Sequence, residues 1–278
     1  MPPTLREDVR VTVDGGTTRR PIGVRLRQWR ELRRLTQLEL SLRTEVSTRH
    51  LSFLENGRAA PSREMLLHLA KHLEVPLRER NQLLLAAGYA PMYRETALDA
   101  PRMSAVRSAV RRLLTAHEPY PALAVDRRWD LVETNESLGA LIEGMAGDLL
   151  APPVNVLRLC LHPDGIAGRI VNLGEWRAHL LGRLRRQIAL TADPDLRALH
   201  TELVAYPCDQ PEPDVELPGP ADVFVPLRIR YRDTELSMFS TVATFGTPLD
   251  VTVAELIIES FFPADDHTAA VLRDRSAT

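Results

Sequence analysis

Apolar residues recur at helical spacing through the first third of the chain. Ile22, Leu26, Trp29 and Leu32 fall on one face of a helix and open this pattern. N-capping residues and helix-terminating residues then divide the segment that follows into separate helices. Together these signals predict five helices, at about residues 22–32, 37–44, 48–55, 62–73 and 78–87.

The second and third of these helices are set apart by their capping residues. Thr36 followed three residues later by Glu39 has the spacing of a capping box, and Ser47 supplies a second N-cap. Asn56-Gly57 supplies a residue that tolerates left-handed backbone and ends the third helix. Two short helices joined by the four residues 44–47 are therefore predicted.

The chain changes character after residue 90. Pro91 and Pro101 bound a segment without apolar periodicity, so residues 91–101 are interpreted as a linker. Residues 1–20 have the same lack of pattern and are interpreted as a flexible arm. Helices are then predicted at 102–117, 135–142, 175–191 and 194–206, and short strands at 122–126 and 130–133. The segment 155–161 fits a short helix or an extended piece.

The last third favours strands. Residues 223–230 and 236–245 are rich in Val, Ile, Thr and Phe and flank the turn-like Arg232-Asp233, which predicts a hairpin. Residues 251–262 form a third strand candidate, although 254–260 also fits a helix, and Asp265 or Asp266 begins a final helix. The predicted fold class is α+β, with an all-α domain at 21–90 and a domain of antiparallel sheet and helices at 102–278.

Length and composition agree with two compact domains. The chain has 278 residues, of which 44% are hydrophobic. It contains no apolar run of about 18 residues and no signal-peptide pattern, so we expect a cytoplasmic protein that does not enter the membrane. Cys160 and Cys208 stand far apart and are expected to be reduced thiols, not a disulfide or a metal site.

Charge is distributed unevenly along the chain. Residues 19–90 hold fourteen Lys or Arg and seven Glu, a net charge of +7, so the remaining residues carry −9 of the total of −2. A codon bias toward arginine is an alternative explanation, since Lys71 is the sole lysine. Such a bias would not remove acidic residues from one segment, and the distribution favours a basic module that meets a polyanion.

The segment 37–56 has the spacing of a helix-turn-helix. Leu40, Val46, Leu51 and Leu54 supply apolar positions that pack two helices together, and Ser41 is small where they cross. A four-residue turn sets the second helix to project into a DNA major groove. Any short helix pair shows some of this spacing, but the caps, the Asn-Gly stop and the basic charge favour a DNA-binding motif.

Several of these residues carry a family resemblance. Arg30, Thr36-Gln37-Leu38-Glu39-Leu40, the run from Val46 to Ser52, Leu54-Glu55-Asn56-Gly57-Arg58 and Pro61-Ser62 resemble the XRE family of phage-repressor-type domains. The resemblance implies that Gln37 contacts phosphate, that Thr48, Arg49 and Ser52 read bases, and that Arg30 and Glu55 form a buried ion pair. The other DNA-contact candidates are Ser47, His50, Phe53, Asn56, Arg58 and Arg63.

Each of these roles has a simpler alternative. Arg49 as a solvated surface arginine and Arg30–Glu55 as an ordinary surface ion pair fit the same sequence. Arg19-Arg20 fits either a minor-groove arm or a disordered tail. Glu45 departs from the family, because many relatives have Gly in that turn, and a non-Gly residue there costs about 1 kcal/mol or forces another turn.

The second domain carries a resemblance of its own. Residues 102–273 resemble the ligand-binding domain of MmyB-like transcription regulators, which implies a PAS-like fold. The matching pieces are Tyr120-Pro121-Ala122-Leu123, Asp126-Arg127-Arg128-Trp129-Asp130 with Asn135, Asn155-Val156-Leu157-Arg158-Leu159 with His162-Pro163, Glu175-Trp176-Arg177, Thr244-Phe245-Gly246-Thr247-Pro248-Leu249-Asp250 and Phe261-Phe262-Pro263-Ala264-Asp265.

The resemblance also suggests a fatty acid or another lipophilic ligand. A sheet with helices across one face encloses an apolar cavity, the usual place for a small molecule. The candidate lining residues are Trp176, Leu180, Leu184, Phe224, Phe239 and Phe245, each of which also fits plain core. Arg169, Arg177 and His179 are candidate partners for an acyl carboxylate, and each also fits a solvated charge.

The sequence shows no catalytic constellation. It contains no Gly-rich phosphate loop, nucleophile elbow or cysteine cluster, and His68 and His72 lack a third metal ligand. We therefore expect no enzyme, no metal and no cofactor beyond the lipophilic ligand. The preferred hypothesis is a homodimeric DNA-binding regulator of a palindromic operator, controlled by that ligand. A C-terminal dimerisation or protein-interaction module without ligand, and an enzyme fused to a DNA-binding domain, are the alternatives.

Overall fold

The computed structural model describes residues 22–142, 144–145, 147–191, 193–213 and 224–275. The predicted arm, including Arg19 and Arg20, and the strand residue Val223 lie outside these ranges. Contacts divide the chain into two compact units, residues 1–92 and residues 93–278, and each is described by itself. No helix in the described ranges is long and apolar enough to cross a lipid bilayer.

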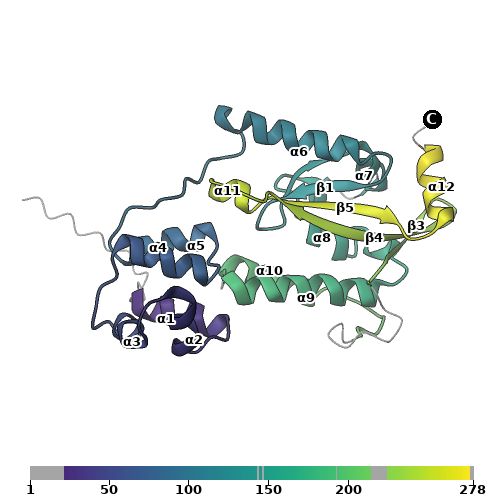
Figure 1. The fold of residues 1–278 in the computed structure, drawn as a ribbon. Coiled ribbons are helices and arrows are strands. Elements are labelled where there is room, and N and C mark those ends of the chain that lie inside the picture. Colours follow the sequence, from purple (N-terminus) through teal and green to yellow (C-terminus); the bar gives the residue numbers. More distant parts are fainter. Residues whose placement is uncertain (1–21, 143, 146, 192, 214–223, 276–278) are drawn as a thin grey trace, which may run out of the picture. The chain divides into compact units, whose positions relative to one another are not determined.

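The first unit is a bundle of five helices (Figure 1). They are α1 (Ile22–Leu32), α2 (Gln37–Thr44), α3 (Thr48–Glu55), α4 (Arg63–His72) and α5 (Leu77–Ala86). Their starts follow the predicted caps. The Thr36 side chain accepts a hydrogen bond from the Glu39 backbone N–H while the Glu39 carboxylate accepts one from the Thr36 N–H, and Ser47 and Ser62 cap α3 and α4.

The core of the first unit joins all five helices. Its fully buried members include Leu26, Leu40, Leu51, Leu54, Leu66, Leu69 and Leu84. Helix α1 lies very close to the end of α3, because a Cβ added at Gly23 would stand 2.4 Å from the Leu54 carbonyl oxygen. Glycine is therefore required at this position for the two helices to meet.

The turn between α2 and α3 keeps its left-handed residue even without glycine. Glu45 has φ 56° and ψ 22°, in the left-handed region, and its side chain is exposed. Of the two outcomes expected for a non-glycine residue, the chain adopts strained backbone rather than another kind of turn. The helix-turn-helix geometry is thereby preserved.

The second unit is built on one five-stranded antiparallel sheet in the order β2-β1-β5-β4-β3. The strands are β1 (Ala122–Val125), β2 (Leu131–Thr134), β3 (Leu227–Tyr231), β4 (Thr234–Thr244) and β5 (Ile257–Pro263). Strands β3 and β4 form the predicted hairpin, in which Tyr231 pairs with Thr234. Together with the helices this gives a PAS-like α+β fold, as the sequence predicted.

Most helices of the second unit lie between strands in the sequence, whereas α6 precedes β1 and α12 follows β5. They are α6 (Ser104–Ala116), α7 (Glu136–Leu141), α8 (Val156–Leu161), α9 (Leu173–Thr191), α10 (Pro194–Val204), α11 (Val251–Ala254) and α12 (Asp266–Arg275), with short 3-10 turns at Pro101–Met103, Gly147–Leu150 and Ala167–Arg169. The segment 155–161, left open by the sequence, is helical because Asn155 caps its first turn. Asn135 caps α7 in the same way.

One strand prediction is corrected. Residues 251–262 do not form a single strand, because α11 occupies their beginning and β5 starts at Ile257. The cause lies at Asp250, whose side chain accepts hydrogen bonds from the Thr252 N–H at 3.0 Å and from the Thr96 hydroxyl at 2.6 Å. The cap at Asp250 thus starts a helical turn where the sequence analysis expected a strand, and the alternative helix at 254–260 is not formed, because β5 begins at Ile257.

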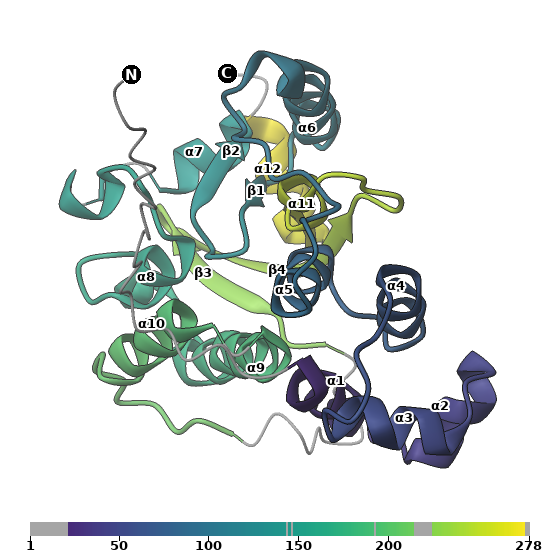
Figure 2. The ribbon, with the colours of Figure 1, turned by 90° about the vertical axis from the view of Figure 1, so that its left-hand side faces the viewer.

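The two faces of the sheet pack against different helices (Figures 1 and 2). In β1, Leu123 and Val125 belong to the larger core with α8, α9 and α10, while Ala122 and Ala124 belong to a smaller core with Val110 of α6. This alternation is the two-residue period of a strand buried on both faces. The larger core contains the candidate ligand site.

Candidate DNA interface and ligand pocket

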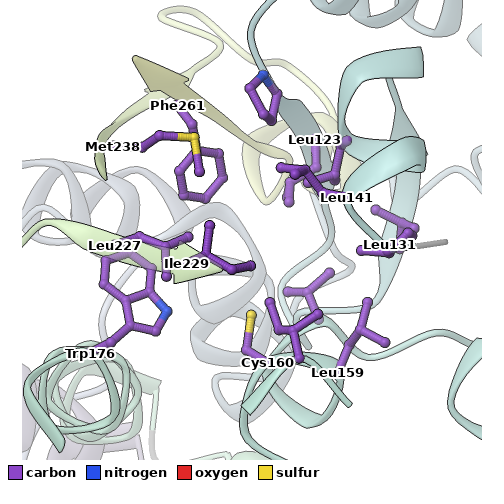
Figure 3. Close-up of a pocket in the computed structure, with 15 residues that line it drawn as sticks. Leu123, Leu131, Leu141, Leu159, Cys160, Trp176, Leu227, Ile229, Met238 and Phe261 are labelled. Atoms are coloured by element: carbon purple, nitrogen blue, oxygen red, sulfur yellow. The ribbon is translucent and has the colours of Figure 1, made fainter. Parts of the chain in front are cut away.

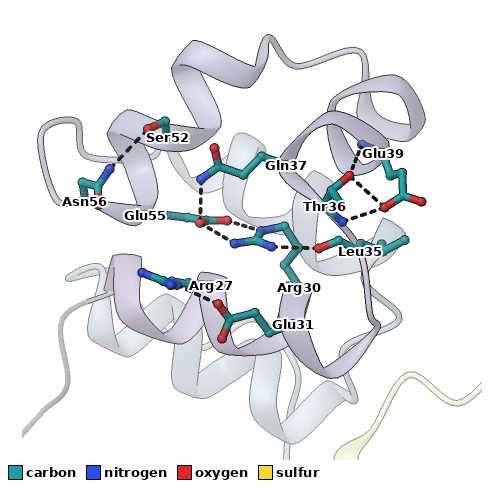
Figure 4. Close-up of polar contacts among 10 residues, drawn as sticks. All are labelled: Arg27, Arg30, Glu31, Leu35, Thr36, Gln37, Glu39, Ser52, Glu55 and Asn56. Atoms are coloured by element: carbon teal, nitrogen blue, oxygen red, sulfur yellow. Dashed lines mark hydrogen bonds and ion pairs between the residues drawn. The ribbon is translucent and has the colours of Figure 1, made fainter.

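A buried charge network holds the first three helices together (Figure 4). Arg30 of α1 donates from Nε and Nη2 to the two carboxylate oxygens of Glu55 of α3, at 2.6 and 2.8 Å. Gln37, the first residue of α2, donates from Nε2 to Glu55 Oε2 at 2.9 Å, and Arg30 Nη1 donates to the Leu35 carbonyl at 2.7 Å. Each of these three helices therefore contributes to one hydrogen-bonded cluster.

The pair is ionised at neutral pH. Burial raises the pKa of the Glu55 carboxyl, but the hydrogen bonds from Arg30 and Gln37 more than offset this, and the pKa is lowered overall. The hydrogen bond to Glu55 raises the pKa of Arg30 against the opposing effect of burial. The side chains are only 10% and 5% exposed, so this is not the surface ion pair of the simpler interpretation.

Helix α3 presents one face to solvent. Among the DNA-contact candidates Ser47, Arg49, Asn56, Arg58 and Arg63 are exposed, and Thr48, His50, Ser52 and Phe53 are half-buried. The buried residues of the same helix are Leu51, Leu54 and Glu55. The candidates therefore lie on surface that the core does not use, and their roles at bases and phosphates stay predictions.

Two contacts order this face. The Arg49 guanidinium lies over the Phe53 ring, 5.4 Å from its centroid, and Asn56 Nδ2 donates to Ser52 Oγ at 3.2 Å. Gln37 uses one amide hydrogen on Glu55, and an amide nitrogen carries two. Its second hydrogen is the donor for the predicted phosphate contact.

An apolar pocket lies inside the second unit, between the sheet and helices α7, α8 and α9 (Figure 3). Its free volume is about 60 Å³. All five strands of the sheet contribute side chains to it. The lining consists of Pro121, Leu123, Leu131, Leu138, Leu141, Ile142, Val156, Leu159, Cys160, Ile166, Trp176, Leu227, Ile229, Met238 and Phe261.

The lining side chains carry no oxygen and no charge. Their hydrogen-bonding groups are the indole N–H of Trp176, the thiol of Cys160 and the thioether sulfur of Met238, which is a weak acceptor. Burial, with a smaller contribution from the negative charge of Glu259, raises the pKa of the Cys160 thiol to about 12. The thiol is therefore neutral at physiological pH, and the pocket suits an apolar molecule.

Of the ligand residues predicted from sequence, only Trp176 lines this pocket. Leu180 and Leu184 lie in the larger core, on later turns of α9. Phe224 and Phe239 pack on each other with ring centroids 5.1 Å apart, and Phe245 packs in the core on the opposite face of the sheet.

The predicted carboxylate partners Arg169, Arg177 and His179 also lie outside the lining of this pocket. Arg169 donates to the carbonyls of Leu141 and Arg230. Arg177 pairs with Glu212 and donates to the carbonyls of Leu203 and Val204. His179 stacks on the Trp176 ring, and burial, reinforced by Arg183, lowers its pKa and keeps it neutral.

The sequence interpretation did not name most of the residues that line this pocket. Leu227 and Ile229 of β3 and Met238 of β4 face the pocket, and Arg228 and Arg230 between them are exposed. The alternation of apolar and charged residues in β3 could have identified these lining residues, because every second residue of a strand faces the same side of the sheet. The α8 residues Val156, Leu159 and Cys160 also recur at helical spacing.

Comparison with known families assigns a family to each of the two units. Residues 26–80 match a helix-turn-helix family model, and the chain is a DNA-binding transcription regulator. Residues 106–274, more than half of the chain, match the model of the MmyB-like transcription regulator ligand binding domain. The chain belongs to this family.

Comparisons with solved structures and with curated proteins add no information about fold or function. A solved structure described as an RNA-binding light-oxygen-voltage receptor shares 14% sequence identity, and the match covers 91% of this chain and 59% of that one. Its TM-score of 0.24 is too low to support any argument about fold or function. Among curated proteins no significant match was found.

Proposed function

We propose that the protein is a ligand-responsive repressor or activator whose first unit binds a palindromic operator as a homodimer. A small lipophilic molecule bound in the second unit controls that binding. The observation that carries the proposal is the pocket lined entirely by uncharged side chains, in a regulator with a helix-turn-helix domain. We also propose a cytoplasmic location, where its DNA target lies.

Arg49 and Thr48 are the proposed base-reading residues. An arginine pairs with two acceptors on a guanine edge, and a threonine offers a hydroxyl or a methyl group. The Phe53 ring beneath the Arg49 guanidinium limits the orientations of that side chain, which favours a fixed contact over a diffuse one. Arg58 and Arg63, both exposed, are the proposed phosphate contacts.

Pocket size restricts the ligand. An engineered cavity of about 150 Å³ holds benzene, and the free volume here is about 60 Å³. A fatty acid with a long acyl chain therefore requires lining side chains to move outward. Such an expansion is a means of control, because a ligand shifts an equilibrium only when it binds one arrangement better than another.

Operator selection tests the DNA half of the proposal. Binding sites are selected from a random DNA pool with the full-length protein and then footprinted at several salt concentrations. We expect two inverted half-sites and a binding constant that falls as salt rises, because each phosphate contact releases counterions. Binding without sequence preference, or without salt dependence, would contradict it.

Native mass spectrometry of freshly purified protein tests the ligand half. A retained lipophile appears as a discrete added mass, which extraction identifies, and adding it back should change the affinity for the operator. Protein that carries no small molecule, and whose operator affinity no lipophile alters, would favour a protein-interaction role for the second unit.

A further inference from the structure

Two buried tryptophans of the second unit differ in how their indole N–H is satisfied. Trp129 donates from Nε1 to Gln187 Oε1 at 2.8 Å, and Gln187 is itself held by its bond to the Arg127 carbonyl. Trp176 is 2% exposed, and its Nε1 has no hydrogen-bond partner among the described residues. Buried polar groups in folded proteins are nearly always paired, so this orphan requires an explanation.

The unpaired N–H belongs to the pocket. Figure 3 shows the Trp176 nitrogen on the side of the ring that faces Cys160 and the middle of the lining residues. A water molecule is a poor partner here, because a buried water needs two to four polar neighbours and this pocket supplies one N–H, one weakly polar thiol and the thioether sulfur of Met238. The donor is therefore available to a ligand.

We propose that Trp176 Nε1–H recognises a single neutral acceptor oxygen, such as a ketone, ester or ether, on an otherwise apolar ligand. This inference rests on the proposed ligand-binding function and adds the chemical class of the ligand. It assigns Trp176 as the residue that orients the molecule, since a lone directional donor in an apolar pocket fixes where the acceptor lies.

An ionised carboxylate does not fit the same site. Among the described residues no cation lines the pocket. Arg177, whose Nε has no partner there, pairs through Nη1 with Glu212 outside the lining, and Arg183 pairs with the buried Glu259 at 2.8 Å. A carboxylate held by one indole N–H would lose most of its hydration without a compensating charge.

Three probes with the same skeleton separate these cases. They are 2-pentanone, 2-methylpentane and butanoate, which have the same branched arrangement of six non-hydrogen atoms and present a ketone, a methyl-bearing carbon and a carboxylate. Benzene also has six, so in a free volume of about 60 Å³ each probe requires lining side chains to move outward, and the matched sizes make this requirement the same for all three. Each is titrated into the full-length protein at pH 7.4, and binding is followed by the indole N–H signals in proton–nitrogen NMR spectra. Trp176→Phe assigns the Trp176 signal, and the paired Trp129 N–H is the internal control.

The ketone should move the Trp176 N–H signal downfield and leave the Trp129 signal in place, while the alkane should bind without that downfield shift. Butanoate should bind at least tenfold more weakly than the ketone. In Trp176→Phe the ratio of the ketone's Kd to the alkane's should rise about twofold to tenfold, the effect of one ordinary hydrogen bond. Comparing ratios cancels the change in pocket size that both probes experience.

Different failures have different meanings. If ketone and alkane bind but the Trp176 signal and the ratio of their Kd values do not respond to the acceptor, the inference is wrong and the ligand-binding function stands. Butanoate binding as tightly as the ketone would also overturn it. If none of the three probes binds, both the inference and the proposed ligand pocket fail. The NMR shift in unaltered protein distinguishes these outcomes even if Trp176→Phe does not fold.

Discussion

The guanidinium of Arg30 and the carboxylate of Glu55 meet through two hydrogen bonds, Nε to Oε1 at 2.6 Å and Nη2 to Oε2 at 2.8 Å. This geometry ties the last turn of α1 to the last turn of α3, the helix proposed to read DNA. Two-point pairing between planar groups fixes orientation as well as distance. The recognition helix is thus positioned by a buried contact on the side opposite its exposed face.

Arg30→Ala should destabilise the first unit by about 3–5 kcal/mol, because it leaves the buried Glu55 carboxylate without its counter-charge. Native-state hydrogen exchange of the α1–α5 amides in the full-length protein measures the change. Arg27→Ala is the matched control on the same helix, since Arg27 pairs with Glu31 at an exposed site and its loss should change little. Equal losses of stability from both substitutions would show that the buried ion pair contributes no more to stability than the exposed one.

The first unit should lose stability in acid through Glu55. Its pKa is lowered in the folded protein from an ordinary value of 4.5, so the ionised pair contributes fully above that value. The contribution is lost as pH falls from about 4.5 through the lowered pKa. Hydrogen exchange between pH 6 and pH 3 should show a smaller acid loss in Glu55→Gln, whose side chain does not titrate. Parallel curves for the two proteins would contradict this.

Glu45→Gly should stabilise the first unit by roughly 1 kcal/mol, the lower end of the cost of a left-handed non-glycine residue. The positive φ of 56° is what glycine adopts without strain. Leu42→Gly is the control, because Leu42 is exposed within α2 and glycine there should destabilise the helix by about 0.5–1 kcal/mol. Opposite signs in exchange measurements would support the argument, and a loss of stability in Glu45→Gly would refute it.

Arg49→Ala should reduce discrimination at one base pair of the operator by about 1–3 kcal/mol and leave the other positions as they were. Arg58→Ala provides the contrast, since a phosphate contact should weaken binding to all sequences and reduce the salt slope by about one. Both are measured against a set of single-base operator variants. A uniform loss in Arg49→Ala would reassign that residue to phosphate binding.

Cys160→Leu should weaken binding of 2-pentanone about tenfold or more, because two added side-chain atoms occupy a pocket of about 60 Å³. Operator binding without ligand should be unchanged. Cys208→Leu is the control, because it makes the same substitution at a cysteine that does not line the pocket. The Cys208 thiol contacts the Gln210 carbonyl instead. Unchanged affinity in Cys160→Leu would place the ligand elsewhere.

The sequence by itself determined the elements of the first unit. Capping residues, the apolar period and the Asn-Gly stop act within one or two helical turns, so Thr36, Ser47 and Asn56-Gly57 located α2 and α3 closely. The XRE resemblance supplied the pairing of Arg30 with Glu55. In the second unit, the order of strands and helices and the antiparallel PAS-like sheet were also predicted from local patterns and the MmyB resemblance.

Only the tertiary structure decided which side chains meet. Contacts between remote segments include the hydrogen bond from Thr96 to Asp250, the cap of α11, and the hydrogen bond from Gln37 to Glu55. Such packing also leaves Arg169, Arg177 and His179 outside the pocket lining. The spacing of apolar residues along the sequence indicates which face of a helix or strand is buried, but it does not indicate which residues of other segments pack against that face. The sequence named Trp176 as a candidate lining residue, but it did not indicate whether the indole N–H of Trp176 or of Trp129 would be paired. Packing gave Trp129 an amide partner and left Trp176 without a partner among the described residues, at an apolar pocket.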